Sequence, residues 1–322
     1  MNEIGVEAIE YVLPARRTSL AQLEEEGRIT SNKEALAEMG FAAALTSDVP
    51  ANRLAYAACK KLLEKTGLDP ERVGLIVNAC AVPISALANG DRDWGGTWGG
   101  KDAALKLLTY SSCRLQHELG LLNARAIGVG EMASMCLLGA VHTTQALMLL
   151  DDVEYAICVE ADVFPANANR ELVYNVVSDG ACAVLLRRGG SRNKFIGYSQ
   201  FTKGFYWDPL VKQNEMVSAY FVTARRTIDA GLKKAGLTIR DIDLMIPANI
   251  SRKSWSVLAG LLEIPIEKVY LESITRQAHS VGADNYINLK DLLDMGRVKP
   301  GDNVLLYSFG VGAHWACQIV RI

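Results

Sequence analysis

Short runs of apolar residues alternate along the chain with longer amphipathic stretches. The clearest apolar runs lie at 73–79, 154–161, 181–187, 242–248, 303–309 and 315–321. Each run is nearly continuous, as expected of a β-strand in a sheet that is covered on both faces. Because helical patterns separate these strands, the sequence predicts an α/β protein built from stacked layers of strands and helices.

Two parts of the chain follow the same order of elements. LEKTGLDPERVGLIV at 63–77 resembles LKKAGLTIRDIDLMI at 232–246: each reads as a helix end, a Gly-Leu turn, an acidic loop and a buried strand. Further on, EYAICVEAD followed by SDGACAVLLR mirrors NVLLYSFG followed by GAHWACQIVR. Two matching blocks in one order predict a duplication. We place the halves at 1–188 and 189–322, with the boundary in the polar connector 187–195.

The amino-acid composition argues against several classes of protein. The 322 residues are 50% hydrophobic and carry a formal net charge of −2, which argues against a nucleic-acid-binding protein. The first twelve residues lack a basic segment, so we expect no signal peptide. The apolar stretch 132–150 contains the polar residues 142–145, so we expect no membrane span. The seven cysteines are scattered without zinc-like spacing, so we expect a reducing, cytoplasmic environment and no metal site.

Six stretches, in this order, resemble the ketoacyl-acyl-carrier-protein synthase III group of the thiolase superfamily. They are IGVEAIEYVLP (4–14), GLDPERVGLIVNAC (67–80), SSCRLQHELGLLNARAIGV (111–129), EYAICVEADV (154–163), VSDGACAVLL (177–186) and GRVKPGDNVLLYSFGVGAHW (296–315). The resemblance implies a five-layered αβαβα fold and a homodimer. It also implies an acyl-enzyme on a nucleophile at a helix N-terminus, with thioesters of coenzyme A or acyl carrier protein as substrates and no cofactor.

The position of that nucleophile is occupied by a serine. Counting forward from Val129, or back from the strand at 154–163, leads to Ser134 where the family normally has cysteine. Cys136 fits only with two extra residues before the helix and two fewer inside it, and we keep it as the alternative nucleophile. A thiol two residues further along would point away from the side that Ser134 faces.

Two other family positions have also changed. Ala248 stands where the resemblance implies a catalytic histidine, and His279 stands at the place of the family's asparagine, five residues before Asp284. A serine nucleophile needs a base, and a base needs a group that orients it. Ser134, His279 and Asp284 therefore form the predicted triad, as in a polyketide starter-unit branch of the family. Taken singly, these residues could be a helix cap, a buried structural histidine and a turn residue.

The oxyanion of the reaction needs backbone donors beside the nucleophile. We expect them from the N–H of Ser134 and from the turn at Gly310, Val311 and Gly312.

The sequence does not decide whether the acyl donor is a coenzyme A thioester or a carrier-protein thioester. Glu34 replaces the tryptophan that the family uses to clamp coenzyme A, whereas Arg252 and Lys253 match the place where the family docks acyl carrier protein. Residues 89–106 look like an insertion, interpreted as a flap.

The sequence thus predicts a cytoplasmic acyltransferase of polyketide or fatty acid biosynthesis that forms an acyl-enzyme on Ser134. Two alternatives stay open: a decarboxylative starter-unit ketosynthase, and a non-catalytic partner subunit of a synthase. Loss of the usual histidine favours the partner subunit, and the pair His279 and Asp284 argues against it.

Overall fold

A computed structural model describes residues 3–81 and 108–322; the insertion expected at 89–106 lies outside them. In this part of the chain, a nine-stranded sheet has the order β11-β12-β13-β10-β1-β9-β6-β4-β5. Its strands are β1 (Ile4–Val12), β4 (Val73–Ala79), β5 (Arg125–Val129), β6 (Tyr155–Asp162), β9 (Gly180–Arg188), β10 (Lys194–Thr202), β11 (Leu244–Pro247), β12 (Asn303–Gly310) and β13 (His314–Arg321). Two small antiparallel pairs join β2 (Arg16–Ser19) to β3 (Ala43–Thr46) and β7 (Glu171–Leu172) to β8 (Asn175–Val176). The six strands expected from the sequence are confirmed to within two residues.

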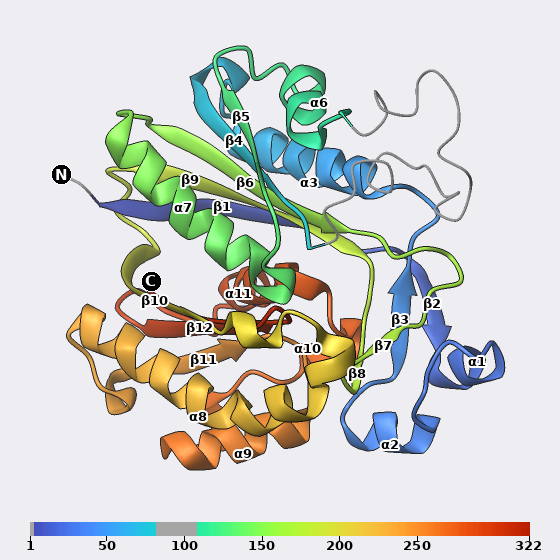
Figure 1. The fold of residues 1–322 in the computed structure, drawn as a ribbon. Helices are drawn as coiled ribbons and strands as arrows, with labels where there is room; N and C mark the ends of the chain where they lie inside the picture. Colours follow the sequence, from blue (N-terminus) through green and yellow to red (C-terminus); the bar gives the residue numbers. More distant parts are fainter. Residues whose placement is uncertain (1–2, 82–107) are drawn as a thin grey trace.

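Helices cover both faces of this sheet. They are α1 (Leu20–Glu25), α2 (Lys33–Glu38), α3 (Ala51–Thr66), α6 (Ser111–Glu118), α7 (Cys136–Leu150), α8 (Pro209–Ala235), α9 (Arg252–Leu262), α10 (Ser273–Gln277) and α11 (Asp284–Asp294). Figure 1 shows α7 and α11 between the two parts of the sheet, α3 and α6 outside one part, and α8 and α9 outside the other. The predicted five-layered αβαβα fold is confirmed.

Side chains of each central strand alternate between two cores, which explains the nearly continuous apolar runs. On β4, Leu75 and Val77 pack toward α7, while Ile76 packs toward α3. On β12, Leu306 joins the inner core and Leu305 packs with α8 and α9. Because successive strand residues point to opposite faces, every position of such a strand is buried.

The two parts of the sheet meet at a narrow junction. Strands before residue 189 lie on one side and β10 to β13 on the other; β1 and β10 pair through Gly5 and Lys194. The division of the chain into two duplicated halves, 1–188 and 189–322, stays a prediction.

One stretch of the described residues, Ala133–Leu150, is long and apolar enough to cross a membrane by length and composition, and half of it is buried inside the protein. It includes α7, which packs against β4 and β6. The interior position of α7 accounts for its apolar character.

Candidate active site

Ser134 lies in a tight turn between β5 and α7. The turn is a single 3₁₀ segment, Ala133–Met135, and Ala133 has a left-handed φ of +44°. Such a backbone costs a non-glycine residue about 1–3 kcal/mol and persists only where the surroundings hold it. One restraint is the Ser308 hydroxyl on β12, which donates to the carbonyl of Ser134 at 2.6 Å. The N-cap of α7 is Met135 without a side-chain bond, so Ser134 is not the cap of this helix.

The hydroxyl of Ser134 meets His279 instead. Ser134 Oγ is 2.8 Å from Nε2 of His279, and Nδ1 of His279 is 2.5 Å from Oδ2 of Asp284. His279 and Asp284 are buried. The three side chains thus form a continuous chain of hydrogen bonds, in the order expected from the sequence, across 145 residues of chain between serine and histidine.

Asp284, the first residue of α11, has a full set of donors. Its Oδ1 accepts from the backbone N–H of Ser280 at 2.7 Å and from Asn249 Nδ2 at 3.1 Å. Its Oδ2 accepts from the backbone N–H of Asn249 at 2.7 Å besides His279 Nδ1. Two oxygens that accept four N–H groups are acceptors only, so the proton between His279 and Asp284 belongs to Nδ1. Nε2 is then left with a lone pair toward Ser134.

The loop that carries His279 is held in place by hydrogen bonds to the backbone N–H and the backbone carbonyl of His279. The N–H of His279 donates to Val176 at 2.9 Å, and its carbonyl accepts from Ser178 at 2.8 Å. The flanking residues Ala278 and Val281 have φ of +54° and +50°. Strained backbone therefore stands on both sides of the site, beside the serine and around the histidine.

Asn249 is a site residue that the sequence reasoning missed. It follows Ala248, is 1% exposed and, besides its two bonds to Asp284, donates to the Ala278 carbonyl at 2.9 Å. Ser273 donates to its Oδ1 at 2.7 Å. Asn249 thus holds the carboxylate of Asp284 in place. The only sign of this in the sequence was its position directly after Ala248, where the family has a histidine.

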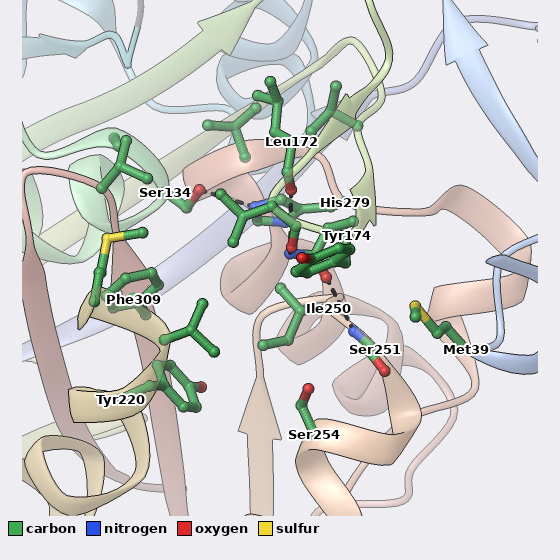
Figure 2. A pocket seen from close by; sticks show the side chains of 18 of the residues that line it. Met39, Ser134, Leu172, Tyr174, Tyr220, Ile250, Ser251, Ser254, His279 and Phe309 are labelled. Carbon is green, nitrogen blue, oxygen red and sulfur yellow. Dashed lines mark hydrogen bonds between the residues drawn. The ribbon is translucent and has the colours of Figure 1, made fainter. Parts of the chain in front are cut away.

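A cavity of about 530 Å³ opens beside Ser134 and His279. Figure 2 shows its walls, with Phe309, Tyr220, Ile250 and Met39 around the space below the serine and histidine. Most lining side chains are apolar; the polar ones include Asn175, Ser251, Lys253 and Ser254. Half-exposed Val217 and Val257, on α8 and α9, belong to the same wall. The cavity therefore offers a mostly apolar compartment beside Ser134 and His279.

Comparison with known proteins gives the relationship. Residues 232–322 match the family model for the C-terminal part of 3-oxoacyl-[acyl-carrier-protein] synthase III. The chain is 23% identical over 286 residues to the beta-ketoacyl-[acyl-carrier-protein] synthase III of Geobacillus kaustophilus, covering 85% of this chain and 84% of that protein. It is 23% identical over 333 residues to the enzyme of the same name from Sphingopyxis alaskensis, covering 96% of both.

The chain is thus similar to synthase III proteins over most of its length. Its fold is similar to that of ChlB3, described as an acyltransferase, with a TM-score of 0.82 at 19% identity, over 99% of this chain and 98% of the other. The synthase III of Aquifex aeolicus gives 0.80 at 19% identity, over 99% and 100%. Cerulenin-bound OleA of Xanthomonas campestris gives 0.81 at 17%, over 99% of both. These relatives support an enzyme that transfers or condenses acyl groups.

Cys136, the alternative nucleophile, lies in the protein core. Its side chain is buried and its Sγ donates to the carbonyl of Cys80 at 3.3 Å. Burial, and then the carboxyls of Glu160 and Asp162, raise the pKa of the Cys136 thiol well above its usual range. A thiol in this state is a weak nucleophile, and Cys136 is not among the residues that line the cavity.

The predicted oxyanion turn lies against the turn of Ser134. A Cβ on Gly310 would stand 2.2 Å from the carbonyl oxygen of Met132, so only glycine permits this approach of β12. Val311 lines the same cavity as Ser134, and Gly312 has a φ of +136°. The role of these amides as donors stays a prediction.

The predicted docking residues Arg252 and Lys253 are the first two residues of α9, and both are exposed. Lys253 lines the cavity, while Arg252 donates to Thr275 Oγ1 at 2.9 Å and packs against Gly40. Only Lys253 of the pair therefore faces the route to Ser134.

No group of three or more His, Cys, Asp or Glu side chains suited to a metal ion occurs among residues 3–81 and 108–322.

Proposed function

We propose that the protein transfers acyl groups from thioesters through an acyl-enzyme on Ser134. The observation that carries this proposal is the hydrogen-bonded series from Ser134 through His279 to Asp284 at the inner end of an apolar cavity. Serine is a poor nucleophile unless a neighbouring base removes its proton, and this arrangement supplies the base and its orienting group.

The proposed first half-reaction runs as follows. Ser134 Oγ attacks the thioester carbonyl carbon while His279 Nε2 takes the hydroxyl proton, and the carbonyl π electrons move to the oxygen. When the tetrahedral intermediate collapses, the carbon–sulfur bond breaks and the imidazolium returns its proton to the departing sulfur. Throughout, Asp284 accepts the hydrogen bond from Nδ1–H of His279 and stabilises the imidazolium. In the second half, an acceptor nucleophile attacks the serine ester, and His279 takes the acceptor's proton and gives one back to Ser134.

The donor arm is expected to enter between α8 and α9. An acyl carrier protein is acidic in the family that this chain resembles, and Lys253 and the N-terminus of α9 present positive charge at that end of the cavity. We therefore favour a carrier-protein thioester over a coenzyme A thioester. The pathway we propose is polyketide or fatty acid biosynthesis in the cytoplasm.

We also propose that the protein is a homodimer. Among residues 3–81 and 108–322, β5 stands at one end of the sheet order and pairs with β4 on one side. An unpaired edge strand is a template for pairing with a second chain, so two copies of β5 could continue one sheet across the dimer. Sedimentation velocity of the purified protein tests this: a monomer at micromolar concentration contradicts it.

Intact-protein mass spectrometry after incubation with a panel of acyl thioesters tests the main proposal. We expect a mass increase of one acyl group in wild type and none in Ser134→Ala. An adduct that persists in Ser134→Ala and disappears in Cys136→Ala moves the nucleophile to the thiol. No adduct with any donor favours the non-catalytic partner subunit. Release of CO2 from a malonyl thioester, with a carbon–carbon product, favours the decarboxylative ketosynthase.

A further inference from the structure

Two buried carboxyl groups stand behind the triad at the end of β6. Glu160 is 1% exposed and Asp162 is 4% exposed. Being two residues apart on a strand, they point to the same face of the sheet. That face is the inner one, because Cys158, two residues earlier, belongs to the inner core and Ala161 to the outer one. Both carboxyls are thus directed toward the layer of α7 and α11.

Glu160 connects the two segments that carry the proposed catalytic groups. Its Oε1 accepts from the backbone N–H of Gly282 at 3.0 Å, and the backbone N–H of Leu137 interacts with the same carboxyl and favours its ionised form. Gly282 lies between His279 and Asp284 in the chain, and Leu137 is in the first turn of α7, three residues after Ser134. One side chain therefore spans the gap between the serine segment and the histidine loop.

The contact with Gly282 depends on the absence of a side chain there. A Cβ on Gly282 would lie 2.3 Å from Oε2 and 2.5 Å from Oε1 of Glu160. These distances are far inside van der Waals contact, so the carboxyl occupies the space that any other residue at 282 would fill.

Electrostatic repulsion determines which of Glu160 and Asp162 is protonated. Two adjacent carboxyls in a dry interior cannot both ionise. Burial, and then the Asp162 carboxyl, raise the pKa of Glu160 well above its usual range. Asp162 in turn accepts from the N–H of Ala81 at 3.2 Å and from the thiol of Cys80 at 3.6 Å. Glu160 is consequently the neutral member, and its Oε2, which accepts no hydrogen bond from the described residues, carries the proton.

We propose that Glu160, as a neutral acid sharing its proton with Asp162, is a positioning residue that holds the Ser134 turn and the His279 loop at reacting distance. The proposal rests on the proposed acyl transfer. Glu160 touches neither reacting atom; it acts through the backbone of Leu137 and Gly282. Among the described residues, the titratable groups that face it are Asp162 on its own strand, Cys136 on α7 and Cys182 on β9, all of them acids. Ionisation of Glu160 would therefore add a repelled charge and loosen the connection.

Two variants separate positioning from simple stability. In Glu160→Gln, the amide oxygen still accepts from Gly282 and the NH2 group still donates to Asp162, so acylation at neutral pH should stay close to the wild-type rate. In Glu160→Ala, the link is removed, and misplacement of reacting groups by about 1 Å costs on the order of 10²-fold in rate. Glu10→Gln is the matched control: Glu10 is also a buried glutamate, but it is paired with Lys61 and Lys65 on the far side of β1.

The pH profile is the decisive readout. Wild-type acylation should fall at high pH as Glu160 ionises, because the neutral acid is the working form. Glu160→Gln should lose this fall, and Glu10→Gln should keep it. A fall at high pH that persists unchanged in Glu160→Gln overturns the proposal, as does wild-type acylation in Glu160→Ala.

Infrared difference spectroscopy keeps the test independent of activity. We expect the carbonyl stretch of a protonated carboxyl in wild type at neutral pH, its loss in Glu160→Gln and its retention in Glu10→Gln. If no donor acylates wild type, the proposed function fails while this band still decides the state of Glu160. A missing band in wild type overturns the shared proton, even if Glu160→Ala does not fold.

Discussion

Asp284→Asn is the sharpest perturbation of the proposed triad. The carboxylate accepts four N–H groups, two on each oxygen. Asparagine offers one oxygen and one NH2 group in place of the two carboxylate oxygens. In either orientation, two of the four N–H donors therefore point at the NH2 group and lose their acceptor. If the NH2 group faces His279, the imidazole must turn its proton to Nε2, and the lone pair toward Ser134 is lost.

The size of the effect follows from these contacts. Each buried donor left without an acceptor costs about 1–3 kcal/mol, so two such donors destabilise the fold by about 2–6 kcal/mol. The wrong histidine tautomer lowers the rate of serine attack by about 10⁴-fold. We expect Asp284→Asn to fold at reduced melting temperature and to acylate about 10⁴ times more slowly.

The assay is a time course of acylation by intact mass, with thermal unfolding measured in parallel. Asp291→Asn is the matched control, because Asp291 is a second buried acid of α11 that binds Tyr11 and Arg276 rather than the histidine. It should lose stability and keep its acylation rate. Acylation of Asp284→Asn within about tenfold of wild type would refute the assignment of Asp284 as the orienting group.

Three further outcomes follow from the same contacts. Ser134→Cys should still form an acyl adduct, as a thioester that hydroxylamine removes faster than the wild-type ester; no adduct would contradict the position of the nucleophile. Gly282→Ala should destabilise wild type by about 1–3 kcal/mol through overpacking against Glu160, and distinctly less in Glu160→Ala, measured by urea unfolding; equal losses would contradict the contact. Lys253→Glu should slow acylation from an acyl carrier protein, with the difference shrinking as salt is added, and leave acylation from a small thioester unchanged; equal effects on both donors would place Lys253 outside carrier docking.

The fold could be predicted because its signals are local. The positions of the three proposed triad residues followed from the family resemblance, and their catalytic roles stay a prediction. Apolar runs mark the strands, and Ser134, His279 and Asp284 stand at countable distances from those strands. Considered alone, Ser134 could have been the N-cap of the following helix. It is not, because Ala133 is left-handed and α7 begins two residues after Ser134. A sequence pattern does not encode that conformation, since the packing of β12 against the turn imposes it.

Contacts between distant segments could not be predicted. Asn249 binds Asp284 across 35 residues and Glu160 binds Gly282 across 122. Neither residue belongs to a motif at fixed spacing, and a buried Asn or Glu carries no sign of its partner. Such residues become visible only when the elements are placed together in space.

The serine and the histidine come from opposite sides of the narrow junction between β1 and β10, 145 residues apart. Contacts of such long sequence separation form late, because the chain must first be closed into a large loop. During refolding from urea, helical signal should therefore return before the ability to be acylated. The hydrogen bond from Ser134 to His279 is then a chemical reporter of the docking of the segments before residue 189 against those after it.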